Sequence, residues 1–235
     1  ISITQKSLAR KHGMILNIEN FDSFRSLVNS IRDINPDIII LFQLTHSGMN
    51  SGAAFSEKKS ICPDPEDNEE LYTNKEIKEI RDQFISAAHL SELAGADGID
   101  FKMCHGYFGG EMLRPSNTRD DDWGGSFENR TRFMREVVKG IRESCTPGFI
   151  IGSRISAFEG IRGGFGTSGP EGIIEELSEF RQLLSLMTDY NFDYVNVSAG
   201  IPSKTPGLTR PVKGNQLQYL NMMRYHKVAK DYLEE

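Results

Sequence analysis

Segments with apolar residues at helical spacing alternate along the chain with short, unbroken apolar runs. Residues 21–34 carry apolar side chains three and four positions apart, which predicts a helix. Residues 38–44 (IIILFQL) form a continuous apolar run typical of a buried parallel strand. The same reasoning predicts helices at about 73–94, from Ser126 onward, at 171–190 and at about 220–233, and strands at 1–4 (a remnant), 98–102, 149–155 and 192–197.

This order amounts to roughly five β–α units in a row, which predicts an α/β fold with a parallel sheet. A doubly wound sheet is the less favoured of two candidates, because no Gly-x-Gly-x-x-Gly follows the first strand. Polar residues follow several strands, at 43–46, 102–107, 154 and 198–200, as they do at the mouth of a (β/α)₈ TIM barrel. Residues 1–235 are therefore expected to form a single domain, an incomplete TIM barrel covering roughly strands 2 to 6.

A complete barrel takes about 250 residues, so this chain is expected to be a piece of a longer one. One unit is expected before Ile1 and two units after Glu235. The long loop at 45–72 is rich in Gly, Ser and acidic residues, and a loop of that length in a compact domain is more often functional than not.

Composition excludes several classes of protein. The formal net charge of −6 provides no basic excess for nucleic acid. Three widely spaced cysteines and no Cys-x-x-Cys argue against a disulfide framework and the usual zinc or iron–sulfur motifs, and favour a reducing cytoplasm. The longest apolar run, 38–42, is too short to span a bilayer. A small-molecule enzyme without membrane or nucleic-acid partners is expected, and a homo-oligomer is compatible with these properties.

Lys102, His105 and Tyr107 form the first candidate site, directly after the predicted strand at 98–102. A phenol can donate a proton to a developing carbanion, and His or Lys can hold a carbonyl oxygen by charge-assisted hydrogen bonds. The spacing alone is also compatible with a purely structural loop, in which the tyrosine packs against the protein and the histidine is exposed to solvent.

Gln43 and Arg154 end two further strands. An amide can both donate to and accept from the edge of a flavin or nucleobase, although pairing with neighbouring backbone is the simpler interpretation of Gln43 alone. A buried guanidinium requires a partner, which for Arg154 is either an anionic ligand or a barrel carboxylate such as Asp100.

Other residues are interpreted as structural, and no metal site is predicted. Asp120, Asp121 and Asp122 cannot all face one ion, so a solvated turn is expected there. Cys104 is expected to be a plain buried or half-buried thiol. His12, His89 and His226 form no pattern in the sequence.

Four segments together resemble one enzyme family. They are FQLTHSG at 42–48, ADGIDFKMCHGYFGGEMLRPSNTRDDDWGGSFENRTRF at 96–133, GSRISAFEG at 152–160 and DYVNVSAG at 193–200. Their order along the chain and their residue patterns resemble those of the old yellow enzyme / NADH:flavin oxidoreductase family of FMN-dependent ene-reductases. The central segment is the most specific, and the resemblance covers nearly the whole chain.

The resemblance implies a TIM barrel that binds FMN, with NADH or NADPH as reductant and an α,β-unsaturated carbonyl compound as substrate. By position, Gln43 and Arg154 would contact the flavin ring, and Thr45 would lie near it. Tyr107 would be the proton donor, and His105 would bind the substrate oxygen.

The chain departs from the family pattern at two positions. Lys102 stands where the family usually has its first oxygen-binding histidine, and Met49 stands where arginine is usual. The family's phosphate-binding loops follow strands 7 and 8, which would lie beyond Glu235. Two alternatives therefore remain: a flavin-free TIM-barrel lyase that uses Lys102, and a non-catalytic barrel fragment.

Overall fold

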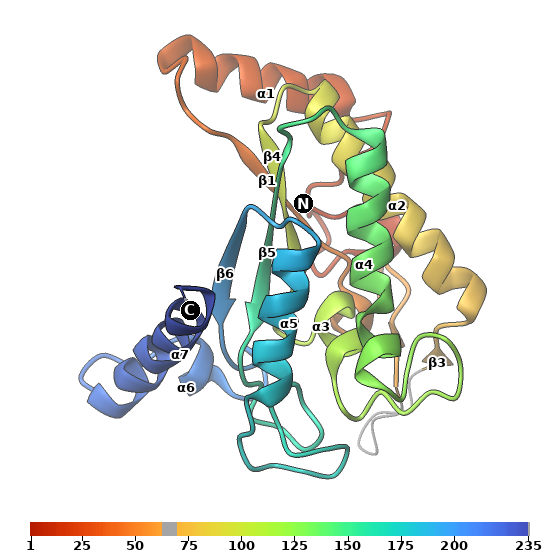
Figure 1. Ribbon diagram of the computed structural model, residues 1–235. Helices are drawn as coiled ribbons and strands as arrows, with labels where there is room; N and C mark the ends of the chain where they lie inside the picture. The colour runs from red at the N-terminus through yellow and green to blue at the C-terminus, as the bar shows by residue number, and fades with distance from the viewer. Residues whose placement is uncertain (63–69, 235) are drawn as a thin grey trace.

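The computed structural model describes residues 1–62 and 70–234 and contains a parallel sheet of four strands. The spatial order follows the chain: β1 (Leu41–Leu44), β4 (Gly98–Met103), β5 (Ile150–Ser156) and β6 (Tyr194–Ser198). Neighbouring strands in sequence are therefore neighbours in space, as consecutive strands of the predicted barrel should be. β1 and β6 form the two edges of this open sheet (Figure 1).

Helices connect the strands and cover one face of the sheet. The long helices are α1 (Phe21–Ile34), α2 (Asn74–Leu93), α4 (Phe127–Ser144), α5 (Ser178–Asp189) and α7 (Gln216–Glu234). Short elements lie between them: α3 (Phe108–Leu113), α6 (Pro206–Thr209), the 3₁₀ turns Gln5–Ser7 and Gly48–Asn50, and the two-residue strands β2 (Lys59–Ser60) and β3 (Glu70–Leu71). α2, α4 and α5 stand side by side along the sheet, whereas α7 lies beside β6 (Figure 1).

Local sequence signals start the two helices that flank β4. Thr73 and Glu76 form a capping box, in which the Glu76 carboxylate accepts from the Thr73 backbone N–H at 2.8 Å and Thr73 Oγ1 accepts from the Glu76 N–H. Ser126 caps α4 by accepting from the Asn129 N–H at 3.2 Å.

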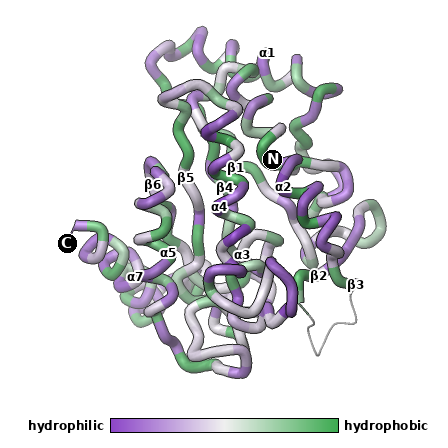
Figure 2. The backbone as a smooth tube through the Cα atoms, turned by 45° about the vertical axis from the view of Figure 1, so that its right-hand side comes forward, coloured by the Kyte–Doolittle hydropathy of each residue, from purple (hydrophilic) through white to green (hydrophobic). Residues whose placement is uncertain are grey.

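The two faces of the sheet differ in chemistry. Phe42, Ile99, Phe101, Ile151 and Ile155 point to the helix-covered face and are almost fully buried. The alternate positions are mainly polar, because successive side chains of a strand point to opposite faces: Gln43, Asp100, Lys102, Arg154, Tyr194 and Ser198. Figure 2 shows hydrophobic and hydrophilic segments alternating along the helices that surround the strands. The polar face corresponds to the interior of the predicted barrel.

Several element boundaries differ from the sequence-based prediction. The strand expected at 38–44 begins only at Leu41, and Ile39 is 66% exposed. The helix expected at 171–190 begins at Ser178, because Glu175 pairs with Thr167 in an isolated bridge instead. The last helix is longer than expected and begins at Gln216.

Residues 1–4 behave as the predicted strand remnant, because Ser2 forms parallel bridges with Ile15 and with Thr45. Thr45 directly follows β1, so this segment lies beside the carboxyl end of that strand. Within residues 1–62 and 70–234, every helix is too short or too polar to cross a lipid bilayer. The predicted loop at 45–72 contains, in its described part, the 3₁₀ turn Gly48–Asn50 and the paired strands β2 and β3, while 63–69 lie outside the described residues.

Candidate active site

β4 leads into a tight turn that positions two of the predicted site residues. His105 and Gly106 both adopt left-handed backbone conformations, with φ of 63° and 68°. This conformation strains a residue with a Cβ by roughly 1–2 kcal/mol, so the surrounding structure must hold His105 in place. The turn ends at Tyr107, which immediately precedes α3.

The short helix α3, which was not predicted, holds this turn against the end of β4. A Cβ atom at Gly109 would lie 2.5 Å from Met103 Sδ, and one at Gly110 would lie 3.1 Å from Cys104 Cα. The two glycines therefore permit a close approach that a larger residue would prevent. The Phe108 N–H also donates to the His46 carbonyl at 3.1 Å, which ties α3 to the segment after β1.

Two basic side chains stand next to each other on the polar face of the sheet. Lys102 and Arg154 are direct partners in the register of β4 and β5. Lys102 Nζ lies 3.1 Å from the centre of the Tyr107 ring, and Arg154 Nη2 donates to Ser198 Oγ at 3.4 Å. The Arg154 Nε is buried and has no hydrogen-bond partner in residues 1–62 and 70–234. Among the described residues neither cation has a carboxylate within ion-pair distance, so this part of the site is electropositive.

Burial, with a smaller contribution from the charge of Arg154, lowers the pKa of Lys102 to about 8. An ammonium with that pKa is still mostly protonated at neutral pH but deprotonates readily. The ion pair with Asp100, considered above as an alternative role for Arg154, is not formed.

Asp100 is instead engaged by neutral donors from the strands on either side. It accepts from Gln43 Nε2 at 3.1 Å and from the Tyr194 hydroxyl at 3.2 Å. The Tyr194 ring reaches Asp100 by crossing over Gly152 of β5, where a Cβ atom would lie 2.0 Å from the ring. A glycine is therefore required at this position of the strand.

His105 is buried, and its ring nitrogen Nε2 lies 2.7 Å from Ser198 Oγ at the end of β6. Burial lowers the pKa of His105 to about 4, with smaller contributions from the charges of Lys102 and Arg154. The imidazole is therefore neutral at physiological pH. Ser198 lies within the polar strand end noted in the sequence, but nothing there singled out this serine as the partner of His105 and Arg154.

Thr45 and Tyr107 complete the predicted set. Thr45 follows β1, and its Oγ1 is buried with no hydrogen-bond partner among the described residues. Burial raises the pKa of Tyr107, so the phenol keeps its proton at neutral pH. The predicted residues thus all lie at or near the carboxyl ends of β1, β4 and β5, and Ser198 of β6 bridges two of them.

Residues interpreted as structural occupy ordinary positions. Cys104 is fully buried, and burial raises the pKa of its thiol to about 12. Asp121 pairs with Arg119 at 2.6 Å and accepts from the Trp123 N–H, while Asp120 is exposed, which agrees with a turn. Met49 is buried, with its sulfur 3.8 Å from Arg114 Nη1.

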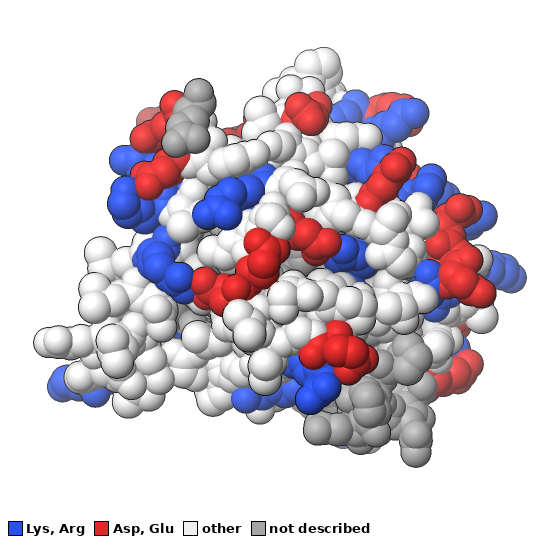
Figure 3. All heavy atoms as spheres, turned by 60° about the horizontal axis from the view of Figure 1, so that its bottom comes forward, with Lys and Arg blue, Asp and Glu red and all other residues white. Residues whose placement is uncertain are grey.

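The face of the molecule at the carboxyl ends of the strands carries acidic and basic side chains side by side (Figure 3). The described residues in this view thus form a surface of mixed charge.

Comparison with known proteins agrees with the sequence resemblance. The model of the NADH:flavin oxidoreductase / NADH oxidase family matches residues 1–222. A curated NADPH dehydrogenase of Clostridium acetobutylicum is 36% identical over 179 residues, which cover 74% of this chain and 49% of that protein. The NADH-dependent flavin oxidoreductase nadA of Aspergillus parasiticus is 31% identical, over 77% of this chain and 41% of its own length. The chain thus spans about half or less of these relatives.

Solved structures share the fold. An old yellow enzyme homologue from Zymomonas mobilis matches with a TM-score of 0.70 at 21% identity, over 86% of this chain and 59% of that one. Histamine dehydrogenase from Rhizobium matches with a TM-score of 0.69 at 24% identity, over 85% of this chain and 29% of that one. These matches confirm the predicted barrel architecture, of which this chain forms a part.

Proposed function

The chain belongs to the NADH:flavin oxidoreductase / NADH oxidase family, and from that premise we propose that the whole protein is an FMN-dependent ene-reductase. It would take reducing equivalents from NADH or NADPH and reduce the carbon–carbon double bond of an α,β-unsaturated carbonyl compound. The observation that carries this proposal is the pair of neighbouring cations, Lys102 and Arg154, beside the neutral groups His105 and Tyr107; neither cation pairs with a carboxylate of the described residues.

The polar groups at the strand ends fit a flavin ring. Arg154 Nε and Thr45 Oγ1 are buried polar atoms without partners among the described residues, which is costly unless a ligand provides hydrogen bonds. Gln43, the residue before the last of β1, lies on the same polar face. These three residues would hold the FMN ring, and bound FMN supplies the hydride chemistry.

The charge of this region suits a ligand that carries or develops negative charge. A cation in a partly buried site stabilises an anion more strongly than it would in water, because the surrounding dielectric is low. Arg154 would stabilise negative charge on the flavin. Lys102 would bind the oxygen of the substrate, at a position where the family usually has a histidine. A lysine provides a mobile point charge whose effect depends on pH.

His105 would bind the same substrate oxygen as a neutral hydrogen-bond donor. Ser198 Oγ accepts from Arg154 and would donate its own proton to His105 Nε2. The imidazole proton would then be on Nδ1, from which it could donate to a ligand. Ser198 would thus be a positioning residue that fixes the tautomer of His105.

Tyr107 would donate the proton that completes the reduction. Its raised pKa keeps the phenol protonated over the physiological range, and the Lys102 ammonium above its ring restricts its position.

The test is steady-state turnover of the protein at full length with NADH or NADPH and 2-cyclohexenone as a simple enone probe. The expected result is enone-dependent oxidation of the nicotinamide and formation of cyclohexanone. Tyr107→Phe should lower the rate of enone reduction while leaving flavin reduction by the nicotinamide nearly unchanged. Equal loss of both rates would contradict the role given to Tyr107, and absence of cyclohexanone would contradict the substrate class.

A flavin-free lyase is the second candidate, favoured by one observation. Lys102 is largely buried and has a pKa lowered to about 8, which are properties of a lysine that forms a Schiff base with a carbonyl compound. Borohydride in the presence of such a compound should then attach it to Lys102. Turnover in the flavin assay without trapping would exclude this candidate, whereas failure of both assays would favour a non-catalytic barrel.

A further inference from the structure

Three potential metal ligands meet at the end of the sheet opposite to the candidate active site. His89 and Glu92 lie one turn apart near the end of α2, and Cys145 lies immediately after α4. α2 ends before β4 begins, and α4 ends before β5 begins, so the cluster lies at the amino ends of these strands. In TIM barrels this end is associated with stability rather than with catalysis.

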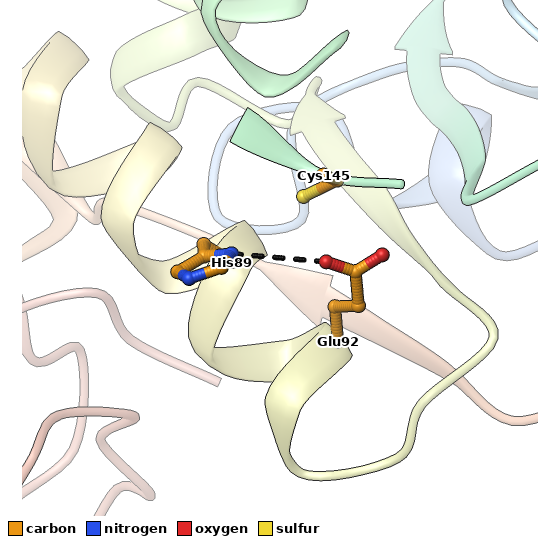
Figure 4. A group of neighbouring side chains, drawn as sticks. All are labelled: His89, Glu92 and Cys145. Atoms are coloured by element: carbon orange, nitrogen blue, oxygen red, sulfur yellow. Dashed lines mark ion pairs between the residues drawn. The ribbon is translucent and has the colours of Figure 1, made fainter. Parts of the chain in front are cut away.

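The ligand atoms are close to one another. One nitrogen of His89, one carboxylate oxygen of Glu92 and the sulfur of Cys145 all lie within 4.8 Å of one another. His89 Nδ1 and Glu92 Oε2 are 3.7 Å apart. Tetrahedral zinc with nitrogen, oxygen and sulfur ligands holds those atoms about 3.4–3.7 Å from each other, so the side chains would approach one another by at most about 1.4 Å on binding. Figure 4 shows the three side chains pointing toward a common space.

Glu92 is already held in the orientation that such a site requires. Its Oε1 accepts from the Thr146 N–H at 2.8 Å and from Thr146 Oγ1 at 2.6 Å. This leaves Oε2 on the side of His89. Hydrogen bonds of this kind orient the ligands of known metal sites and increase their affinity.

The cluster is also accessible to an ion from solution. The His89 side chain is 46% exposed and that of Glu92 is 18% exposed, while Cys145 is half-buried. One imidazole, one carboxylate and one thiolate form a ligand set suited to zinc rather than to magnesium or calcium, which prefer oxygen ligands.

We propose that His89, Glu92 and Cys145 bind a zinc ion, with water in the fourth position. Binding would release the proton of the Cys145 thiol and link the end of α2 to the turn between α4 and β5. This site is independent of the proposed flavin chemistry, because it lies at the other end of the strands.

The test is zinc titration of the chelator-treated protein at full length, without a histidine tag. Calorimetry should show one saturable site, and cobalt in place of zinc should give the near-ultraviolet band of a cobalt–thiolate bond. His89→Ala and Cys145→Ser should each weaken zinc binding about tenfold or more. His226→Ala removes an exposed histidine elsewhere on α7 and is the matched control, which should bind as the unaltered protein does.

A second measurement on the unaltered protein does not depend on the folding of any variant. Cys62 and Cys104 are buried, so a thiol reagent should modify Cys145 first, and zinc should slow that reaction about tenfold or more while magnesium should not. The proposal is overturned if zinc does not protect Cys145, or if Cys145→Ser binds zinc with unchanged affinity.

Discussion

Nε2 of His105 and Oγ of Ser198 lie 2.7 Å apart, although the two residues are 93 positions apart in the sequence. This contact joins the turn after β4 to the end of β6. Through the hydrogen bond from Arg154 to the same hydroxyl, Ser198 also connects the residue proposed to bind the flavin with the residue proposed to bind the substrate oxygen.

Replacement of Ser198 by alanine removes both hydrogen bonds and leaves the tautomer of His105 undetermined. We expect kcat/KM for the enone to fall about tenfold, which corresponds to about 1.4 kcal/mol, the scale of one buried hydrogen bond. Nitrogen NMR of the His105 ring should report the Nδ1–H form in the unaltered protein and a mixture in the variant. Ser153→Ala is the matched control, because that buried serine donates to the Phe101 carbonyl on the other face of the sheet. An unchanged His105 spectrum in Ser198→Ala would contradict the positioning role.

The charge of Lys102 should produce a pH dependence in enone reduction. The ammonium form is required, so kcat/KM for the enone should fall as pH rises through about 8. Lys102→Arg should move this decline above the measurable pH range. Lys102→Met should have a lower kcat/KM that no longer changes with pH near 8. If the decline near pH 8 persists in Lys102→Met, another group is responsible for the pH dependence.

The same lysine should reduce the stability of the fold at neutral pH. Its pKa is lower in the folded protein than in the unfolded chain, so the unfolded chain binds more protons between about pH 8 and 10.5 and stability rises with pH in that interval. Below about pH 8 the buried ammonium of Lys102 destabilises the fold to its full extent. Lys102→Met should therefore raise the free energy of unfolding at pH 7 by on the order of 1–3 kcal/mol, measured by urea denaturation. A lower stability of this variant would show that Lys102 makes a net favourable contact.

Glu111 of α3 provides a second stability effect with the opposite pH trend. Burial raises the pKa of Glu111 to about 7, and one of its carboxylate oxygens has no hydrogen-bond partner. The folded protein therefore holds a proton that the unfolded chain loses above about pH 4.5, and stability decreases between about pH 4.5 and 7. Glu111→Gln should flatten this decline and be more stable than the unaltered protein at pH 8. An identical pH profile for both proteins in urea denaturation would refute the assignment.

Gly152 should tolerate alanine only if Tyr194 is shortened as well. The added methyl would overlap the Tyr194 ring, and overpacking of this kind costs about 1–3 kcal/mol. Tyr194→Ala alone removes the obstacle and the hydrogen bond to Asp100. In a double-mutant cycle, Gly152→Ala should cost less stability in the Tyr194→Ala background than in the unaltered protein. Additive costs would mean that the ring does not limit this position.

Elements with strong local signals were predicted correctly from the sequence. The helix starts near Thr73 and at Ser126 and the helix expected from the apolar spacing of 21–34 each depend on neighbouring residues, and all three are confirmed. The strand order and the barrel class were also predicted, because parallel units connected by helices pack in sequence order. The start of α5 was wrong because the bridge between Thr167 and Glu175 is a non-local pairing that hydrophobic spacing does not reveal.

The site was predictable only in part, because contacts between distant segments of the chain do not show in local sequence patterns. Residues at or near the carboxyl end of a strand can be recognised by their position, as Lys102, His105 and Arg154 were. The partners that set their chemistry come from distant segments: Ser198 for His105, and Gln43 with Tyr194 for Asp100. The grouping of His89 and Glu92 with Cys145 likewise requires the packing of α2 against α4.

The most direct test of the proposed function is an anaerobic visible spectrum of the full-length protein, incubated with FMN, desalted, and then mixed with NADH or NADPH. The account predicts a retained flavin band that bleaches with one of the two reductants, and a much weaker retained band in Arg154→Ala. Failure to retain FMN, or full retention and bleaching in Arg154→Ala, would contradict the flavin site proposed at the ends of β1 and β5.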